Sequence, residues 1–182
     1  MISKTIKSLA AYKIIKSAER HRNPFLGNPP ESCVLILDKI NLEELEILKT
    51  LSSELKIKKE DFFVVECTEK SSSATSDRVF KIGWNDINFK GDFKNPDLNK
   101  ISSLGADLLI TFAEENNRLV QLLSASVRAG IKLGNSKSEF LDVVIKTDDA
   151  AIFRNELIKF LKQLNCNDDK FDGNRSSISY SL

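Results

Sequence analysis

A strand–helix–strand unit in the first third of the chain sets the fold class. Residues 33–37 (CVLIL) are apolar at every position, as a central strand of a parallel sheet requires, and Asp38 follows them. A helix is predicted next, because Asn41 can cap it and Glu44 completes a capping box. Residues 62–67 (FFVVEC) form the next apolar run. Two such strands joined by a helix make a parallel βαβ unit.

The second half of the chain repeats this pattern. Residues 107–112 (DLLITF) predict another buried strand, and an amphipathic helix is expected over 115–129, ending before Gly130. Residues 131–133 then return as a short strand. The sequence therefore predicts two βαβ units that share one sheet.

Shorter apolar runs complete the expected sheet. Residues 79–82 predict an edge strand and residues 141–145 a last strand. A final helix, opened by Thr147 or Asp148, carries apolar residues at helical spacing. The expected fold class is α/β and Rossmann-like, with a small, mostly parallel sheet flanked by helices.

Breaks in the pattern divide the chain into four expected parts. These are a basic N-terminal helix at 1–22, a Pro-rich linker at 23–31, an α/β domain at 32–165 and a polar, largely disordered tail at 166–182. A chain of 182 residues with 41% hydrophobic residues suits a single main core.

Positive charge is concentrated at the N-terminus. The whole chain has a formal net charge of +1, whereas residues 1–22 hold six basic residues against the single acid Glu19, a net of +5 that leaves −4 on the remainder. Such a segment could neutralise phosphates on RNA, although Tyr12 is its only aromatic residue for base stacking. The candidate residues for contact with a nucleic acid or a partner are Lys4, Lys7, Lys13, Lys16, Arg20 and Arg22.

The cysteines and the hydropathy pattern favour a cytoplasmic protein. Cys33, Cys67 and Cys166 are an odd number at wide spacing, which fits neither a disulfide framework nor a zinc site. No stretch reaches the length of about 20 apolar residues that a membrane-spanning helix needs, and no secretory signal is recognisable. The basic N-terminus keeps a transit peptide open as an alternative.

Candidate ligand-binding residues lie where the predicted strands end, because ligands of open parallel sheets sit outside the carboxyl ends of the strands. Asp38, Thr111 and Asn116 occupy such positions, with a structural role for Asp38 as a loop or cap residue as the alternative. The glycines never take the spacing of a dinucleotide or P-loop motif, and His21 is the only histidine. No catalytic residue, metal site or cofactor is therefore predicted.

The strand cores and turns also carry a family resemblance. The segments 106–110 (ADLLI), 122–126 (LLSAS), 130–134 (GIKLG) and 142–145 (DVVI) resemble an uncharacterised bacterial family of small α/β proteins, known chiefly from the Bacteroidetes. The same region is similar to the N-terminal half of heptosyltransferase-type glycosyltransferases. The resemblance implies an architecture and no activity, because 182 residues leave no room for the second, sugar-nucleotide-binding domain of those enzymes.

Two functions are expected from these observations. The first is a non-enzymatic cytoplasmic interaction protein, whose basic N-terminal helix contacts a protein or ribonucleoprotein partner. The alternative is a small-molecule-binding or glycosyltransferase-like half domain that uses the strand ends around Asp38 and Thr111.

Overall fold

The computed structural model describes residues 29–38, 40–68, 79–88, 93–94, 96, 99 and 105–171, with side chains as far as residue 164. The expected basic helix at 1–22, its six candidate contact residues and most of the linker lie outside the described residues, as do residues 172–182 of the expected tail. The short helix that Pro96 could open lies largely outside them too.

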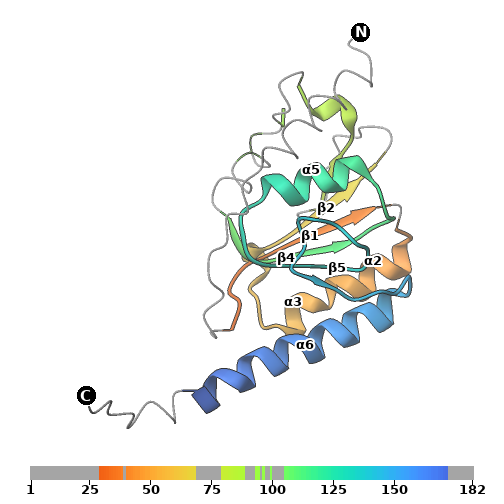
Figure 1. Ribbon diagram of the computed structural model, residues 1–182. Helices are drawn as coiled ribbons and strands as arrows, with labels where there is room; N and C mark the ends of the chain where they lie inside the picture. Colours follow the sequence, from red (N-terminus) through yellow and green to blue (C-terminus); the bar gives the residue numbers. More distant parts are fainter. Residues whose placement is uncertain are drawn as a thin grey trace, which may run out of the picture.

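A six-stranded sheet forms the centre of the described structure (Figure 1). The strands are β1 (Cys33–Asp38), β2 (Phe62–Cys67), β3 (Val79–Ile82), β4 (Ala106–Phe112), β5 (Ala129–Gly134) and β6 (Val143–Val144). Their spatial order is β3-β2-β1-β4-β5-β6, and every neighbouring pair is parallel. The α/β, Rossmann-like prediction is confirmed, with a sheet that is parallel throughout instead of mostly parallel.

Helices cover both faces of this sheet, as parallel strands require. The helices α2 (Leu42–Lys49), α3 (Leu51–Glu54) and α6 (Ala150–Phe171) lie on one face, and α5 (Arg118–Ser126) crosses the other (Figure 1). α2 packs against α6, and α5 packs against β1 and β4. The sheet is therefore the middle of three layers.

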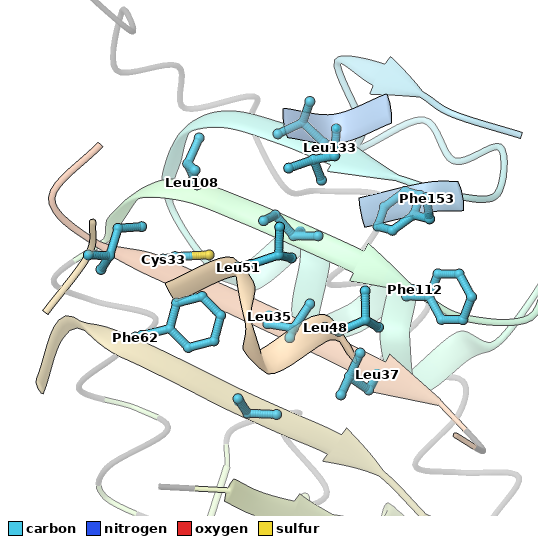
Figure 2. Packing of buried hydrophobic residues seen from close by; sticks show 14 of the residues in the cluster. Cys33, Leu35, Leu37, Leu48, Leu51, Phe62, Leu108, Phe112, Leu133 and Phe153 are labelled. Carbon is cyan, nitrogen blue, oxygen red and sulfur yellow. The ribbon is translucent and has the colours of Figure 1, made fainter. Parts of the chain in front are cut away.

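Alternation along the strands divides the core into two clusters. Cys33, Leu35 and Leu37 of β1 pack under α2, α3 and α6, where Phe153 and Leu48 are fully buried (Figure 2). Val34 and Ile36 point to the opposite face and pack with residues of α5. Because the side-chain period of a strand is two, Asp38 falls on the α5 face at the end of β1.

Asn41 caps α2, as the sequence predicts. Its Oδ1 accepts from the Glu44 N–H at 2.9 Å, and the Glu44 carboxylate accepts from the Asn41 N–H at 2.9 Å, which closes the capping box. Asn41, and not Asp38, therefore caps this helix.

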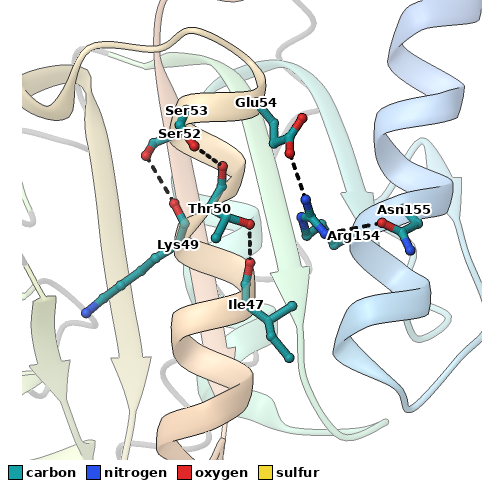
Figure 3. A network of polar contacts seen from close by, with 8 residues as sticks. All are labelled: Ile47, Lys49, Thr50, Ser52, Ser53, Glu54, Arg154 and Asn155. Atoms are coloured by element: carbon teal, nitrogen blue, oxygen red, sulfur yellow. Dashed lines mark hydrogen bonds and ion pairs between the residues drawn. The ribbon is translucent and has the colours of Figure 1, made fainter.

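The predicted helix that starts at Asn41 is interrupted at Thr50 (Figure 3). The hydroxyls of Thr50, Ser52 and Ser53 each donate to the carbonyl three residues earlier, and such bonds compete with the helical ladder. Arg154 of α6 donates to Glu54 at 2.7 Å, which ties the short α3 to α6. The short α3 therefore stays joined to the covering layer.

Other element ends differ from the expected ones. α5 begins at Arg118 instead of residue 115, because Asn117 caps it by accepting from the N–H groups of Leu119 and Val120. β6 is two residues long, and α6 continues past residue 165, the expected end of the domain, to Phe171.

Asp107 fastens the beginning of β1 to β4. Its Oδ2 accepts from the N–H groups of Glu31 and Ser32 at 2.8 and 2.9 Å and from the Ser32 hydroxyl at 3.0 Å, while the Asp107 N–H donates to that hydroxyl. One carboxylate oxygen therefore holds the chain as it enters the centre of the sheet.

We expect Asp107→Ala to lower the free energy of unfolding by about 1 kcal/mol, because three donors lose an acceptor that water replaces only in part. Urea unfolding followed by circular dichroism measures the change. Asp107→Asn is the matched control, since it keeps one acceptor oxygen and should lose less. Equal losses in the two variants would contradict this role of the acceptor.

Candidate functional site

The order of the strands marks one position at the carboxyl edge of the sheet. The chain runs outward from β1 through β2 to β3, and it returns to β4 on the other side of β1 before running outward again to β6. The connections that leave β1 and β4 therefore diverge to opposite faces, under α2 and α5 respectively (Figure 1). This divergence is the topological switch point, where open α/β sheets bind their ligands.

Asp38 ends β1 at this point. In the sheet register it lies beside Cys67 of β2, and Ile36, two residues earlier, lies beside Thr111 of β4. Asp38 is only 8% exposed, and its Oδ2 is buried without a hydrogen-bond partner in the described part of the chain. A buried acceptor without a donor costs about 1–3 kcal/mol, and more when it is charged, so the fold alone does not account for this side chain.

Thr111 lies on the same face of the neighbouring strand. It is 3% exposed, and its hydroxyl donates to the Leu133 carbonyl of β5 at 3.4 Å. A hydroxyl has one proton, so the Thr111 oxygen keeps lone pairs that can still accept a hydrogen bond. The structure thus brings two predicted residues, Asp38 and Thr111, to the same edge and the same face of adjacent strands.

Gly134 makes room for Thr111. It pairs with Thr111 in the register, and a Cβ at position 134 would overlap the Thr111 hydroxyl and lie 2.6 Å from Cδ1 of Leu141. Only glycine permits this close approach of β5 to β4.

Asn135 fixes the end of β4 and is a residue that the sequence analysis missed. Its side-chain oxygen accepts from the Ala113 N–H at 2.8 Å, its amide nitrogen donates to the Thr147 carbonyl at 3.4 Å, and its own N–H donates to the Thr111 carbonyl at 3.2 Å. It is 9% exposed. Its position directly after β5, at the carboxyl edge, is the signal that could have found it.

Asn116 does not lie with Asp38 and Thr111 at the buried ends of the strands. It is exposed in the loop between β4 and α5, with a left-handed φ of 71°. Glu114 and Glu115 are exposed in the same loop, and because α5 begins only at Arg118, the expectation that the helix starts at residue 115 is wrong. The loop forms the rim of the switch point and not its floor.

The two described cysteines are inert packing residues. Burial, and to a smaller extent Asp107, raises the pKa of the Cys33 thiol, and burial followed by the charges of Asp38 and Glu66 raises the pKa of Cys67. A thiol held in its neutral form is a poor nucleophile and metal ligand. Cys67 lies beside Asp38 in the sheet register, so the side of the switch point that faces β2 is apolar.

Lys132 of β5 lies at the other end of α5. Its ammonium donates to the Ser124 carbonyl in the last turn of that helix, and its backbone N–H donates to Asp142 at 3.0 Å. Burial lowers the pKa of Lys132 to about 8, against the opposing attraction of Asp142. The contact at a helix C-terminus identifies a structural lysine and not part of the switch point.

This lowered pKa gives a pH-dependent stability. In the unfolded chain Lys132 keeps its proton to about pH 10.4, so between about pH 8 and 10 the unfolded state binds more protons and the folded state gains stability as pH rises. We expect the free energy of unfolding of the native chain, minus that of Lys132→Met, to increase across this range. The difference removes the contributions of the cysteines, which both proteins share. A difference that is flat or falls with pH would contradict the lowered pKa.

The described residues contain no group of three or more His, Cys, Asp or Glu side chains that could share a metal ion. No helix among them is long and apolar enough to cross a membrane.

The comparisons with known proteins identify a family, but that family has no known function. A family of unknown function (DUF6913) matches residues 4–164 of the chain. No curated protein and no solved structure matches it. The Bacteroidetes origin and the similarity to heptosyltransferase halves stay predictions. Since the family match covers all six described strands and most of the chain, the chain belongs to this family of unknown function.

Proposed function

We propose that the protein binds a small molecule at the switch point between the carboxyl ends of β1 and β4. The observation that carries the proposal is Asp38, a carboxylate that is 8% exposed and whose Oδ2 lacks a hydrogen-bond donor among the described residues. Its free acceptor stands at the position where parallel sheets bind ligands, and Thr111 adds an oxygen on the same face. The local helix is capped by Asn41, so capping does not require Asp38.

A fragment screen tests this proposal. The full chain is mixed with a library of neutral, cationic and anionic fragments, and hits are mapped by amide chemical-shift changes. We expect hits that move the amides of Asp38, Thr111 and Ala113 together, because these residues line one edge. Asp38→Leu, which fills the edge with an apolar side chain, should weaken every such hit, whereas Leu42→Ala on the exposed start of α2 should not. Hits that map only elsewhere, or no hits at all, would reject the site.

A second function is favoured by the segregated charge. The net charge of +5 on residues 1–22, against −4 on the remainder, supports a non-enzymatic role in which the basic segment contacts a protein or ribonucleoprotein partner. The two functions are compatible, since they use different parts of the chain. A reducing, cytoplasmic location is part of this proposal, and the free thiols of Cys33 and Cys67 support it.

Affinity capture with the full chain and with a chain that lacks residues 1–22 tests the second function. We expect the partners to be lost without the segment, and nucleic acid among them to be released at high salt. Retention of the same partners by the shortened chain would refute the role of the segment.

A further inference from the structure

We infer that the ligand at the switch point is a hydrogen-bond-donating organic cation, of the ammonium class, and not a phosphate-bearing molecule. The inference rests on the proposed function and adds the chemistry that the described side chains select. It depends on which donors and acceptors at the carboxyl edge of the sheet are already engaged.

Three backbone N–H groups at this edge are already engaged. The N–H groups of Leu119 and Val120, at the start of α5, donate to the side chain of Asn117. The N–H of Ala113, at the end of β4, donates to Asn135. Phosphate sites on parallel sheets use free amides at this position, often beside glycines, so these three described N–H groups are not available to a phosphate.

The acceptors at the same edge are available. Asp38 Oδ2 has no donor within the described residues, and the Thr111 hydroxyl donates its one proton to the Leu133 carbonyl. Both side chains lie on one face of adjacent strands and keep lone pairs that can accept a hydrogen bond. An ammonium group carries up to three donors and a positive charge, which suits a buried carboxylate that lacks a donor.

Charge at the rim does not reverse this preference. Glu114 and Glu115 are exposed on the loop after β4, and Arg118 follows them as the first residue of α5, so the rim carries both signs. Glu66 near the end of β2 is paired with Lys81 at 3.3 Å. Among the described residues, the buried carboxylate of Asp38 therefore supplies the negative charge inside the edge. A metal ion is a weaker match, because the described residues offer no cluster of three or more ligating side chains.

A charge-selectivity titration of the full chain tests the inference. The cationic probes are ethylammonium, ethanolamine and putrescine, and the other probes are inorganic phosphate, pyrophosphate, adenosine monophosphate and magnesium chloride, all at equal ionic strength. The readout is the shift of the amides of Asp38, Thr111 and Ala113. We expect at least one amine to saturate these shifts, and Asp38→Asn to weaken its binding at least tenfold. Glu115→Gln, which removes an exposed carboxylate from the rim, should change it less than twofold.

Several results would overturn the inference. Saturation of the same amides by phosphate, by the nucleotide or by magnesium, with no response to the amines, would assign the site to a different ligand class. An equal loss of amine binding in Glu115→Gln and Asp38→Asn would show that general electrostatic attraction, and not a site at Asp38, binds the amine. If neutral fragments occupy the edge but no amine does, the inference fails while the proposed function stands. If no probe or fragment moves these amides, both fail.

Discussion

Replacing Phe153 by alanine should lower the free energy of unfolding by about 3–5 kcal/mol, the largest effect expected for a single described residue. Phe153 is fully buried in the cluster between the sheet and the covering helices (Figure 2). Its ring centre lies 5.3 Å from that of Phe112 on β4, with the rings tilted by 48°. The substitution would leave a cavity where α6 meets the sheet, at a position where neighbouring residues cannot close in fully.

The neighbouring residue provides a matched control for Phe153. Ile152 is on the same turn of α6 but is 53% exposed, so Ile152→Ala removes a large apolar side chain from water and not from the core. We expect that variant to stay within about 0.5 kcal/mol of the native chain. Urea unfolding, with the slope m compared between variants, measures both changes. A loss below about 1 kcal/mol for Phe153→Ala would show that α6 does not anchor the layer in this way.

Gly134→Ala should cost about 2–3 kcal/mol, because the added Cβ would overlap the Thr111 hydroxyl and press on Leu141. The backbone conformation at Gly134 is not the cause, since its φ is not positive. The cost comes from the Thr111 side chain, which lies against Gly134 on the paired strand at the carboxyl edge of the sheet.

A double-mutant cycle isolates that approach. Thr111→Ala removes the hydroxyl that the new Cβ would meet, so the pair Gly134→Ala and Thr111→Ala should be less destabilising than the sum of the single changes by about 1 kcal/mol. Thermal or urea unfolding of the four proteins gives the coupling. Strict additivity would mean that the Thr111 hydroxyl does not cause the cost of Gly134→Ala.

The fold was largely predictable because its signals are local. Continuous apolar runs gave β1, β2 and β4, and Asn41 with Glu44 gave the start of α2. The errors concern element ends, where polar side chains decide. Asn117 delays the start of α5 to Arg118, and the hydroxyls around Thr50 interrupt the first covering helix. These hydrogen bonds compete with helix propensity and leave no periodic trace in the sequence.

The candidate site was predictable only in part. The rule that ligands bind at strand ends selected Asp38 and Thr111, and both lie at the switch point. It also selected Asn116, which is exposed on the rim, and it missed Asn135. The strand order β3-β2-β1-β4-β5-β6 decides which ends become neighbours, and this order is a long-range property that no local pattern encodes. That Asp38 is buried without a described partner could be learned only from the packed structure.

The stability of Asp38→Asn, in the absence of any ligand, tests most directly whether Asp38 serves a ligand and not the fold. Asparagine keeps the size of the side chain and removes a buried charge whose Oδ2 has no described donor, so the free energy of unfolding should rise by about 1 kcal/mol or stay unchanged. Urea unfolding of the ligand-free proteins at neutral pH measures the difference. A gain or no change is the result predicted for a residue kept for binding. A loss of more than about 1 kcal/mol would contradict the account, since it would show that the carboxylate of Asp38 has a stabilising partner within the protein.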